Sequence, residues 1–503
     1  MKNAYLAWMQ CSELRQNRQR NKRFVFGDQW ADQCTDLAGN TITERQKLTQ
    51  ACQTPLTNNL LRQVVRTVVG RFRAQVINAE QIRANSLLQV IQANHLNELD
   101  SRALEEFLIS GACVQRVEPL ADVPGGVRVD NVNLNHFFID SATDPRGDDS
   151  TIVGMLHDLT LPQIMRRVAQ GNRRKAQWVQ RLYSTQIEER VNDFASSIGA
   201  GSVRGYDFWH APAGRYRAIE VWTLESQEVL TCHDKRRGTL TNIPFSDTSA
   251  VKHAKNDPNI TSRYDIVHQW HCRWYSPMGD LLCHFISPWP GGRHPFITKF
   301  YPLIDGEVHS FVEGAIDQQK HVNRMITLAD QIMTVSAKGV LLFPATALPD
   351  GFTWRDVRRA WSSPTGILPY DPREHSAKPE QMITQKGNSD AYNMISLQMK
   401  LLEQVSGVSG ALQGKSEAAG LQSASLYDAQ AQNANLALTD IYDTFNTFRH
   451  MRNRKILTLL GDGSIAERPA ADNPSPAAES VPQTPQDPAS RDDGSTAPAE
   501  ALR

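Results

Sequence analysis

The stretch from His309 to Val335 constrains the fold more than any other part of this sequence. Its residues repeat in alternating steps of four and three, which places them along one narrow stripe of an α-helix. The stripe consists of Phe311, Ala315, Gln318, Val322, Met325, Ala329 and Ile332, and the polar residues predicted to lie off it are Asp317, Gln319, Lys320 and Arg324. So narrow a stripe predicts a long helix that packs against other helices, and we expect the chain to self-associate through it.

Helical and strand-like segments alternate in blocks around this helix, which predicts an α+β fold of several domains. The helical blocks are 60–69, 84–110, 163–195 and 391–460, and the strand-like blocks are 113–117, 127–132 and 216–301. Residues 462–503 are rich in Pro, Ala, Ser and Asp. That composition cannot bury enough apolar surface to offset the entropy of ordering, so we predict a disordered tail.

The charge balance of the chain disfavours one class of function. The 503 residues include 54 basic and 54 acidic side chains. A protein that works by gripping DNA phosphates usually has a basic excess, so tight charge-driven DNA binding is not expected, whereas a smooth DNA conduit is allowed. We expect no transmembrane helix and no signal peptide, because long apolar runs are missing. The seven scattered cysteines predict reduced thiols.

Several histidines and cysteines fall within seventeen positions, which suggests a metal site. They are His268, His271, Cys272, Cys283 and His284. Zinc prefers such ligands, but their spacing matches no standard zinc finger or ribbon. On a strand His268 and Cys272 share one face and His271 points to the other. We interpret the group as a strand pair with interior cysteines, and we expect no metal and no cofactor.

Other patterns of chemistry are weak or missing. The sequence contains no Gly-x-Ser-x-Gly and no His-Glu-x-x-His motif. Residues 406–416 resemble a phosphate-binding loop, but Ser409 stands where the motif needs its first glycine, so we interpret them as a hinge between helices. The acidic residues Asp140, Asp144, Asp148 and Asp149 lack a calcium-loop pattern and are interpreted as a solvated turn. We therefore predict no catalytic residue and no enzyme activity.

Basic residues form three runs, at 15–23, 166–175 and 449–455. Runs of this kind are usually the solvated face of a helix, which is how we interpret all three. The run at 166–175 is also suited to contact DNA or an acidic protein surface, and the sequence leaves that choice open.

Several short motifs share their order and spacing with one known family. They are Gly27-Asp28-Gln29-Trp30, Leu56-Thr57-Asn58-Asn59, Phe137-Phe138-Ile139-Asp140 before His157, His294-Pro295-Phe296, Asp317-Gln318 with Asn323, and Gly407-Val408-Ser409-Gly410 with Ser423-Ala424-Ser425. Over about residues 20–455 they resemble the portal proteins of tailed bacteriophages, especially those of short-tailed phages. The signature residues that the resemblance assigns are Gly27, Gln29, Trp30, Leu56, Thr57, Asn59, Asp317, Gln318 and Asn323.

The resemblance implies a subunit of a twelve-membered ring at one capsid vertex, with a wing, stem helices, a clip and a crown. The ring would conduct double-stranded DNA without sequence specificity during packaging and ejection. Implied partners are the large subunit of the terminase motor, the major capsid and scaffolding proteins, and the neck or tail adaptors, with no membrane. The implied location is the virion, and the host cytoplasm during assembly.

The same resemblance suggests how the chain is divided. The predicted parts are an N-terminal wing (1–162), a wing and first stem region (163–215), a strand-rich clip (216–305), a second stem helix (306–335), a wing return beside the tunnel (336–390), a helical crown (391–461) and the tail (462–503). Within the clip, Lys235, Arg236 and Arg237 are predicted to face the motor, and tryptophans such as Trp222, Trp270 and Trp274 to anchor it.

Two other functions stay open at this point. One is a different structural protein of the virion, such as a neck or minor capsid component; the length of the chain and its long helix argue against a small adaptor. The other is a nucleic-acid packaging enzyme, against which the missing phosphate loop counts.

Overall fold

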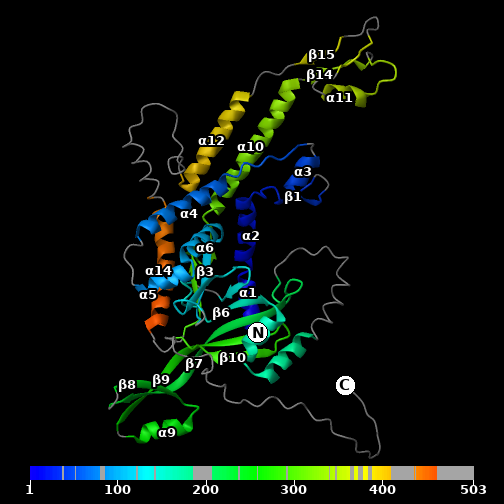
Figure 1. Cartoon of the computed structure of the whole chain (residues 1–503). Helices are drawn as coiled ribbons and strands as arrows, with labels where there is room; N and C mark the ends of the chain where they lie inside the picture. Colours follow the sequence, from blue (N-terminus) through cyan, green and yellow to red (C-terminus); the bar gives the residue numbers. More distant parts are fainter. Residues whose placement is uncertain are drawn as a thin grey trace, which may run out of the picture.

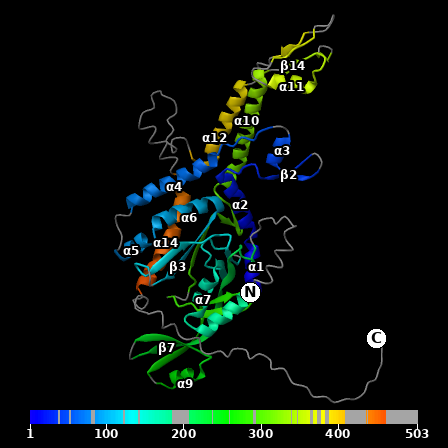
Figure 2. The same ribbon diagram turned by 45° about the vertical axis from the view of Figure 1, so that its right-hand side comes forward.

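A long helical hairpin rises from the body of the molecule. In the computed structural model, α10 (Glu313–Lys338) and α12 (Asn388–Ser406) lie side by side and form this hairpin (Figures 1 and 2). The residues that the structure describes are 1–36, 39–50, 53–79, 85–120, 123–140, 143–184, 207–235, 238–257, 259–289, 293–338, 340–345, 348–362, 367–371, 378–382, 388–408, 436 and 438–461.

A small unit joins the two helices at the far end of the hairpin. Strands β14 (Val340–Leu342) and β15 (Glu380–Met382) pair antiparallel, and α11 (Trp354–Ser362) lies beside them (Figure 1). We call the described residues between 340 and 382 the tip. Only Val357 of α11 is deeply buried, so the tip has a very small core.

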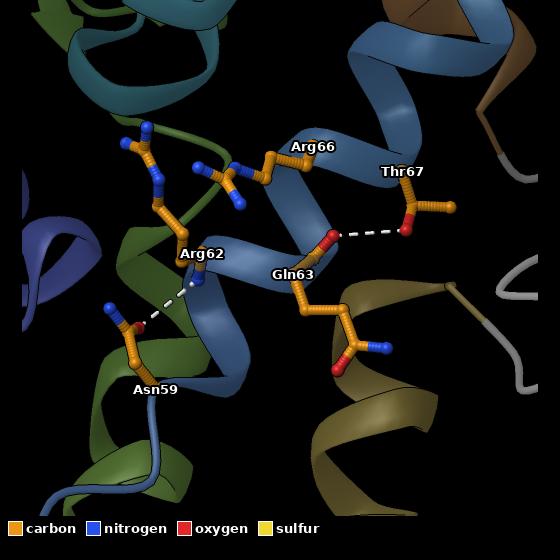
Figure 3. A pocket seen from close by; sticks show the side chains of 5 residues that line it. All are labelled: Asn59, Arg62, Gln63, Arg66 and Thr67. Carbon is orange, nitrogen blue, oxygen red and sulfur yellow. Dashed lines mark hydrogen bonds between the residues drawn. The ribbon is translucent and has the colours of Figure 1, made fainter.

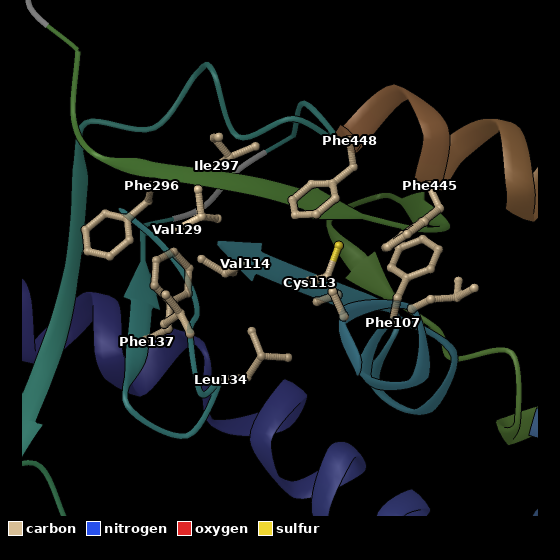
Figure 4. Packing of buried hydrophobic residues seen from close by; sticks show 14 of the residues in the cluster. Phe107, Cys113, Val114, Val129, Leu134, Phe137, Phe296, Ile297, Phe445 and Phe448 are labelled. Atoms are coloured by element: carbon tan, nitrogen blue, oxygen red, sulfur yellow. The ribbon is translucent and has the colours of Figure 1, made fainter. Parts of the chain in front are cut away.

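The body is built on a three-stranded antiparallel sheet with the order β11-β3-β4. The strands are β3 (Ala112–Pro119), β4 (Val127–Asn131) and β11 (Phe296–Phe300). Helices α6 (Leu96–Ser110) and α14 (Thr439–Gly461) pack against it. Their aromatic side chains, including Phe107, Phe445 and Phe448, meet the apolar face of β3 in the main core (Figure 4).

A larger antiparallel sheet lies below, with the order β10-β9-β7-β6-β5 and with β8 paired to β7. Its strands are β5 (Phe137–Ile139), β6 (Ile152–Leu159), β7 (Tyr216–Asp234), β8 (Thr239–Pro244), β9 (Ile260–Tyr275) and β10 (Leu281–Ile286). Helix α7 (Leu161–Ala169) follows β6. The far halves of β7 and β9, with β8 and α9 (Thr248–Asn256), project as an arm with its own small core (Figure 1).

The N-terminal helices tie the body to the hairpin. Helix α1 (Lys2–Gln10) packs on β5 and β6, and α2 (Ser12–Phe26) packs on α6 and on α10. Helix α4 (Leu60–Ala79) runs between the hairpin and α6 (Figure 1). The remaining short elements are β1 (Gln33–Thr35), β2 (Thr41–Thr43), α3 (Glu44–Gln50), α5 (Asn85–Ala93), β12 (Leu303–Ile304) and β13 (Glu307–Val308).

The α+β class is confirmed, since helices combine with strand pairs that are antiparallel in each described case. The structure does not separate residues 216–305 as a compact module, however. Strand β7 pairs along its first half with β6, and β11 belongs to the sheet of β3. Strands on both sides of residue 216 therefore share hydrogen bonds and a core.

Some of the predicted segments lie outside the described residues. The tail at 462–503 lies outside them, as do residues 185–195 of the helical block 163–195. The described cysteines are free thiols. No helix in the described part of the chain is long and apolar enough to cross a membrane.

Candidate functional site

Helix α2 ends in a turn that delivers a glutamine into the protein interior. Gly27 adopts a left-handed conformation, with φ of 98°, that side chains other than glycine rarely adopt. The amide of Asp28 donates to the carbonyl of Arg23 at 2.9 Å, as in a glycine-terminated helix end. The chain then reverses, and Gln29 becomes 1% exposed. Its side-chain amide Nε2 donates to the carbonyl of Phe24 at 2.7 Å, which fixes the turn.

Three polar side chains at successive turns of α10 contact this region. Gln319, Asn323 and Thr327 are spaced by four residues and are all buried. Gln319 Oε1 accepts from the backbone amides of Leu60 and Leu61 at 3.0 and 3.2 Å. These amides belong to the first turn of α4, where a helix has no partners of its own for them. The Gln319 side chain of α10 therefore caps the start of α4.

The next two residues of this polar stripe bind the segment that precedes α4. Asn323 Oδ1 accepts from the backbone amide of Asn58 at 3.0 Å, and Thr327 Oγ1 accepts from that of Leu56 at 3.1 Å. Asn323 Nδ2 donates to Gln29 Oε1 at 2.5 Å, and this bond closes the connection to the end of α2. The base of α10 is thus fixed by directional hydrogen bonds to two separate segments.

The remaining signature residues complete this connection. Asn59 Oδ1 accepts from Gln29 Nε2 at 3.1 Å, and Asn59 Nδ2 donates to the carbonyl of Val25 at 2.8 Å. The indole of Trp30 donates to Thr57 Oγ1 at 3.1 Å. We call this set of bonded residues the joint: Gly27, Gln29, Trp30, Leu56, Thr57, Asn58, Asn59, Gln319, Asn323 and Thr327. It positions the hairpin relative to the body.

Seven of the ten residues of the joint are among the predicted signature residues, and Asn58, Gln319 and Thr327 are not. Gln319 was expected off the helical stripe, and the structure corrects this, because its side chain is fully buried. Thr327 was not singled out. The signal was present, as Gln319, Asn323 and Thr327 recur at every fourth position of the helix. Conversely, Asp317 is exposed and Gln318 has a buried Oε1 that finds no partner among the described residues, so neither is part of the joint.

The predicted apolar stripe of α10 lies largely inside the subunit. Ala315, Val322 and Ala329 are buried, while Phe311, Met325 and Ile332 are half-buried. Phe311 precedes the first turn of α10. The stripe therefore serves the packing of one chain, and substitutions at Val322 would test folding before they test assembly.

Exposed apolar residues instead lie on other faces of the hairpin and on the tip. On α10 and α12 their exposed fractions lie between 39% and 53%. These residues, which point in several directions around the two helices and which we call together the outer face, are Leu328, Met333, Tyr392, Met394, Leu397 and Val405. The tip adds Leu342, Phe352, Trp354, Ile367 and Tyr370, with Ile367 at 87% exposure. So dense a set of exposed large apolar side chains is typical of a surface that another protein covers.

A second polar centre links the two sheets through buried charges. Arg116 on β3 donates from Nη1 and Nη2 to Glu220 on β7 at 2.5 and 3.0 Å, and it also pairs with Glu118. His157 on β6 contacts Glu220 through Nε2 at 2.6 Å and stacks on Trp274 with ring centroids 4.6 Å apart. We call these residues the sheet cluster.

Protonation in the sheet cluster follows from burial and pairing. Burial alone would raise the pKa of Glu220, but the charge of Arg116 and the hydrogen bond from His157 hold that pKa well below its ordinary value. Burial lowers the pKa of His157, although Glu220 acts in the opposite direction. At neutral pH the cluster therefore contains an ionised Glu220, a charged Arg116 and a neutral His157.

A third buried centre corrects the interpretation of the basic runs. Asp100 on α6 accepts from Arg449 Nε at 2.8 Å and pairs with Arg452, both on α14. Arg452 is 1% exposed, so this part of the run at 449–455 is not a solvated face. Arg15 and Arg18 are likewise buried, Arg18 against Glu106 and Arg15 over the ring of Trp8. Burial lowers the pKa of Arg15 to about 10.

The histidines and cysteines that the sequence suggested as zinc ligands make other contacts in the structure. His271 Nδ1 lies 3.1 Å from His284 Nε2, whereas His268 bonds Ser226. Burial raises the pKa of Cys283 to about 11 and that of Cys272 above its usual range, which disfavours the thiolates that zinc needs. Within the described ranges no three His, Cys, Asp or Glu side chains gather as metal ligands.

The acidic turn and the predicted motor-facing residues show different contacts. Asp149 accepts from Thr143, Asp144 pairs with Arg146, and Asp140 accepts from Thr151, so the turn is held by local hydrogen bonds. Lys235 is exposed on the arm, and Arg236 and Arg237 lie outside the described residues. The tryptophans Trp222, Trp270 and Trp274 are buried core residues and not exposed anchors.

A shallow pocket opens beside the joint, on the solvent side of α4. It has a volume of about 390 Å³ and is lined by Asn59, Arg62, Gln63, Arg66 and Thr67 (Figure 3). Arg62 pairs with Glu105 at 3.1 Å and lies over the ring of Phe26. No acidic side chain in the described chain pairs with Arg66.

The sequence model of one protein family, described as phage P22-like portal protein, matches residues 1–462. The match covers nearly the whole described chain, including the joint, both sheets and the hairpin. No curated protein matches the sequence. The chain belongs to the phage P22-like portal protein family, and is thus a portal protein of the short-tailed-phage type. This is a structural family of the virion, associated with the capsid vertex, and it is not a family of enzymes.

Proposed function

We propose that the chain assembles into a ring that forms the channel for DNA packaging and ejection at a capsid vertex, normally with twelve subunits. Family membership supports the role in the portal. The single observation that carries the assembly step is the outer face, because the hairpin exposes six large apolar side chains that its own chain leaves uncovered. A ring gives each such face a neighbour, and cyclic symmetry gives every subunit the same contact.

The ring is tested on the full-length chain by negative-stain imaging and mass photometry. Leu397→Asp places a charge on the outer face, and because the side chain is 48% exposed we expect the fold to tolerate it. We expect loss of rings with an unchanged melting temperature of the monomer. Met278→Asp is the matched control, because Met278 is 63% exposed in a turn next to β10. Rings that form equally well in both variants would contradict the assignment of the contact.

We also propose that the ring docks a packaging motor and later the neck or tail. The predicted docking part is residues 216–305, with Lys235 on its surface. The tip is a second candidate. What favours the tip is its exposed Trp354, Ile367 and Tyr370 beside the basic residues of α11, since exposed aromatics and arginines are typical of binding hot spots.

Binding of the terminase large subunit to assembled rings separates the two docking surfaces. Ile367→Asp should abolish binding if the tip docks the motor, and Lys235→Glu should lower it modestly, most at low salt, if the arm does. Both residues are exposed, so neither change should disturb the ring. Motor binding that withstands both substitutions would reject both surfaces.

Capsid and scaffolding proteins remain proposed partners of the body, and assembly in the host cytoplasm is proposed with them. A different structural role in the virion is the remaining alternative, since the same hairpin could join a non-portal ring. Images of rings located at one vertex of the particle would exclude that alternative.

A further inference from the structure

Helix α4 has a net positive charge, in contrast to the chain as a whole. Within its 20 residues the helix has four arginines and no acidic residue, although the whole chain is electrically balanced. Its inner side, formed by Leu61, Val65 and Val68, is fully buried. The arginines therefore have to lie at the edges and on the solvent side of the helix.

Three of the four arginines form one row. Arg62, Arg66 and Arg73 are separated by four and seven residues, so they project within about 40° of one another around the helix axis. In Figure 3 the guanidinium groups of Arg62 and Arg66 project to the same side of α4, and both line the pocket. Only Arg62 has an acidic partner, Glu105, among the described residues. The row therefore has an excess of positive charge.

We propose that this row, which we call the arginine row, binds phosphate groups of duplex DNA, with one phosphate seated in the pocket between Arg62 and Arg66. The inference rests on the proposed function, because it assumes DNA passing through the ring. Asn59, Gln63 and Thr67 line the same pocket with amide and hydroxyl groups, which are common donors to phosphate oxygens.

The composition of the row favours DNA over a neighbouring protein subunit. Beside the arginines, Gln63, Thr67 and Gly70 are polar or small, Val69 is apolar and partly buried, and none of these four is aromatic, whereas the centres of protein interfaces are depleted of charge and rich in aromatic side chains. The outer face on α10 and α12 has the composition expected of the subunit contact. Two or three exposed arginines also bind phosphate weakly and in a salt-dependent way, so DNA can still slide.

The test uses full-length protein and a fluorescein-labelled duplex of mixed sequence, with anisotropy measured from 50 to 200 mM salt. Arg66→Gln combined with Arg73→Gln should weaken binding roughly tenfold at 50 mM salt and make the plot of log K against log salt shallower. Arg66→Lys combined with Arg73→Lys should restore most of the affinity, because phosphate contact depends chiefly on charge. Arg128→Gln is the matched control, since Arg128 is an exposed arginine that pairs with Asp130.

Two results would overturn the proposal that the arginine row binds DNA. Equal affinity and equal salt dependence in the wild type and the double variant would overturn the proposal. So would loss of rings in the glutamine variant, because the row would then face the neighbouring subunit. A wild-type chain that forms no ring would overturn the proposed function instead, while the DNA measurement on that chain would still decide whether the row binds phosphate.

Discussion

The body and the hairpin of this subunit are stabilised in different ways. The body buries aromatic side chains between helices and sheets and closes two clusters of buried charges, all within one chain. In the hairpin, α10 and α12 pack mainly on each other, a polar joint binds the base of α10 to the body, and the apolar outer face is partly exposed. From this difference we expect the body to be stable alone and the hairpin to gain contacts in the proposed ring.

Removal of Asp100 should have the largest effect. Asp100→Ala leaves Arg449 and Arg452 buried without their carboxylate, so we expect the body to lose about 3–5 kcal/mol of unfolding free energy. Chemical denaturation of the monomer measures this loss. Asp130→Ala removes an exposed acid that pairs with Arg128 and should change stability by less than about 0.5 kcal/mol. Equal losses in the two variants would show that burial of the pair is not what matters.

Breaking the joint should cost less and should act locally. Gln319→Ala leaves the amide of Leu61 without an acceptor and that of Leu60 with only the carbonyl of Asn58, at about 1–3 kcal/mol for an unpaired amide that water does not reach. Hydrogen exchange at these two amides should accelerate while exchange in β3 stays slow. Asp317→Ala on the same helix is the control and should change neither. Uniform acceleration across the body would mean that hairpin and body unfold together.

Acid should destabilise the sheet cluster, alongside the site of His294, a histidine of the body whose pKa burial also lowers. The folded pKa of His157 lies below its ordinary value of 6.5, so its contribution is present above pH 6.5 and is lost as the pH falls below it. The depressed pKa of Glu220 adds a second loss, below its ordinary value of 4.5. Between pH 6.5 and 5.5 we expect a loss of about 1 kcal/mol, measured by denaturation. His157→Gln should flatten that part of the profile, and an unchanged profile would contradict the assignment.

Substitution on the outer face should have the smallest effect on a single subunit. Met394 is 44% exposed, so Met394→Gln should change the stability of the monomer by less than about 0.5 kcal/mol. The same change should lower the melting temperature of assembled rings, because each subunit then loses an apolar contact. A monomer destabilised as strongly as the ring would mean that the hairpin already covers this residue.

The sequence predicted the elements better than their contacts. The helical spacing from 309 to 335 led to α10, and the order of the short motifs led to the family and to most residues of the joint. The burial of Gln319 was missed because a glutamine among charged residues looks solvated, and only the partner amides at the start of α4 reveal its role. Those amides lie about 260 positions away in the chain.

The strand pairing across the predicted boundary at 216 was not foreseen, for a related physical reason. Strand periodicity identifies β7 and β9 but does not say which strand pairs with β7 on its other side. The answer, β6, lies about 60 positions earlier in the chain and joins two parts that composition had separated. Buried arginines were missed in the same way, since Arg452 becomes a core residue only when Asp100 faces it.

The order of elements along the chain has a consequence for synthesis on the ribosome. The hairpin lies between β11 and α14, and α14 packs on β3 and β11 to cover the body sheet. A nascent chain therefore emits the whole hairpin before it emits the last helix that its own core needs. The core of the body therefore cannot be completed until the hairpin, with its exposed apolar residues, has been synthesised. Folding of the body and exposure of the proposed assembly surface then occur within the same few seconds of translation.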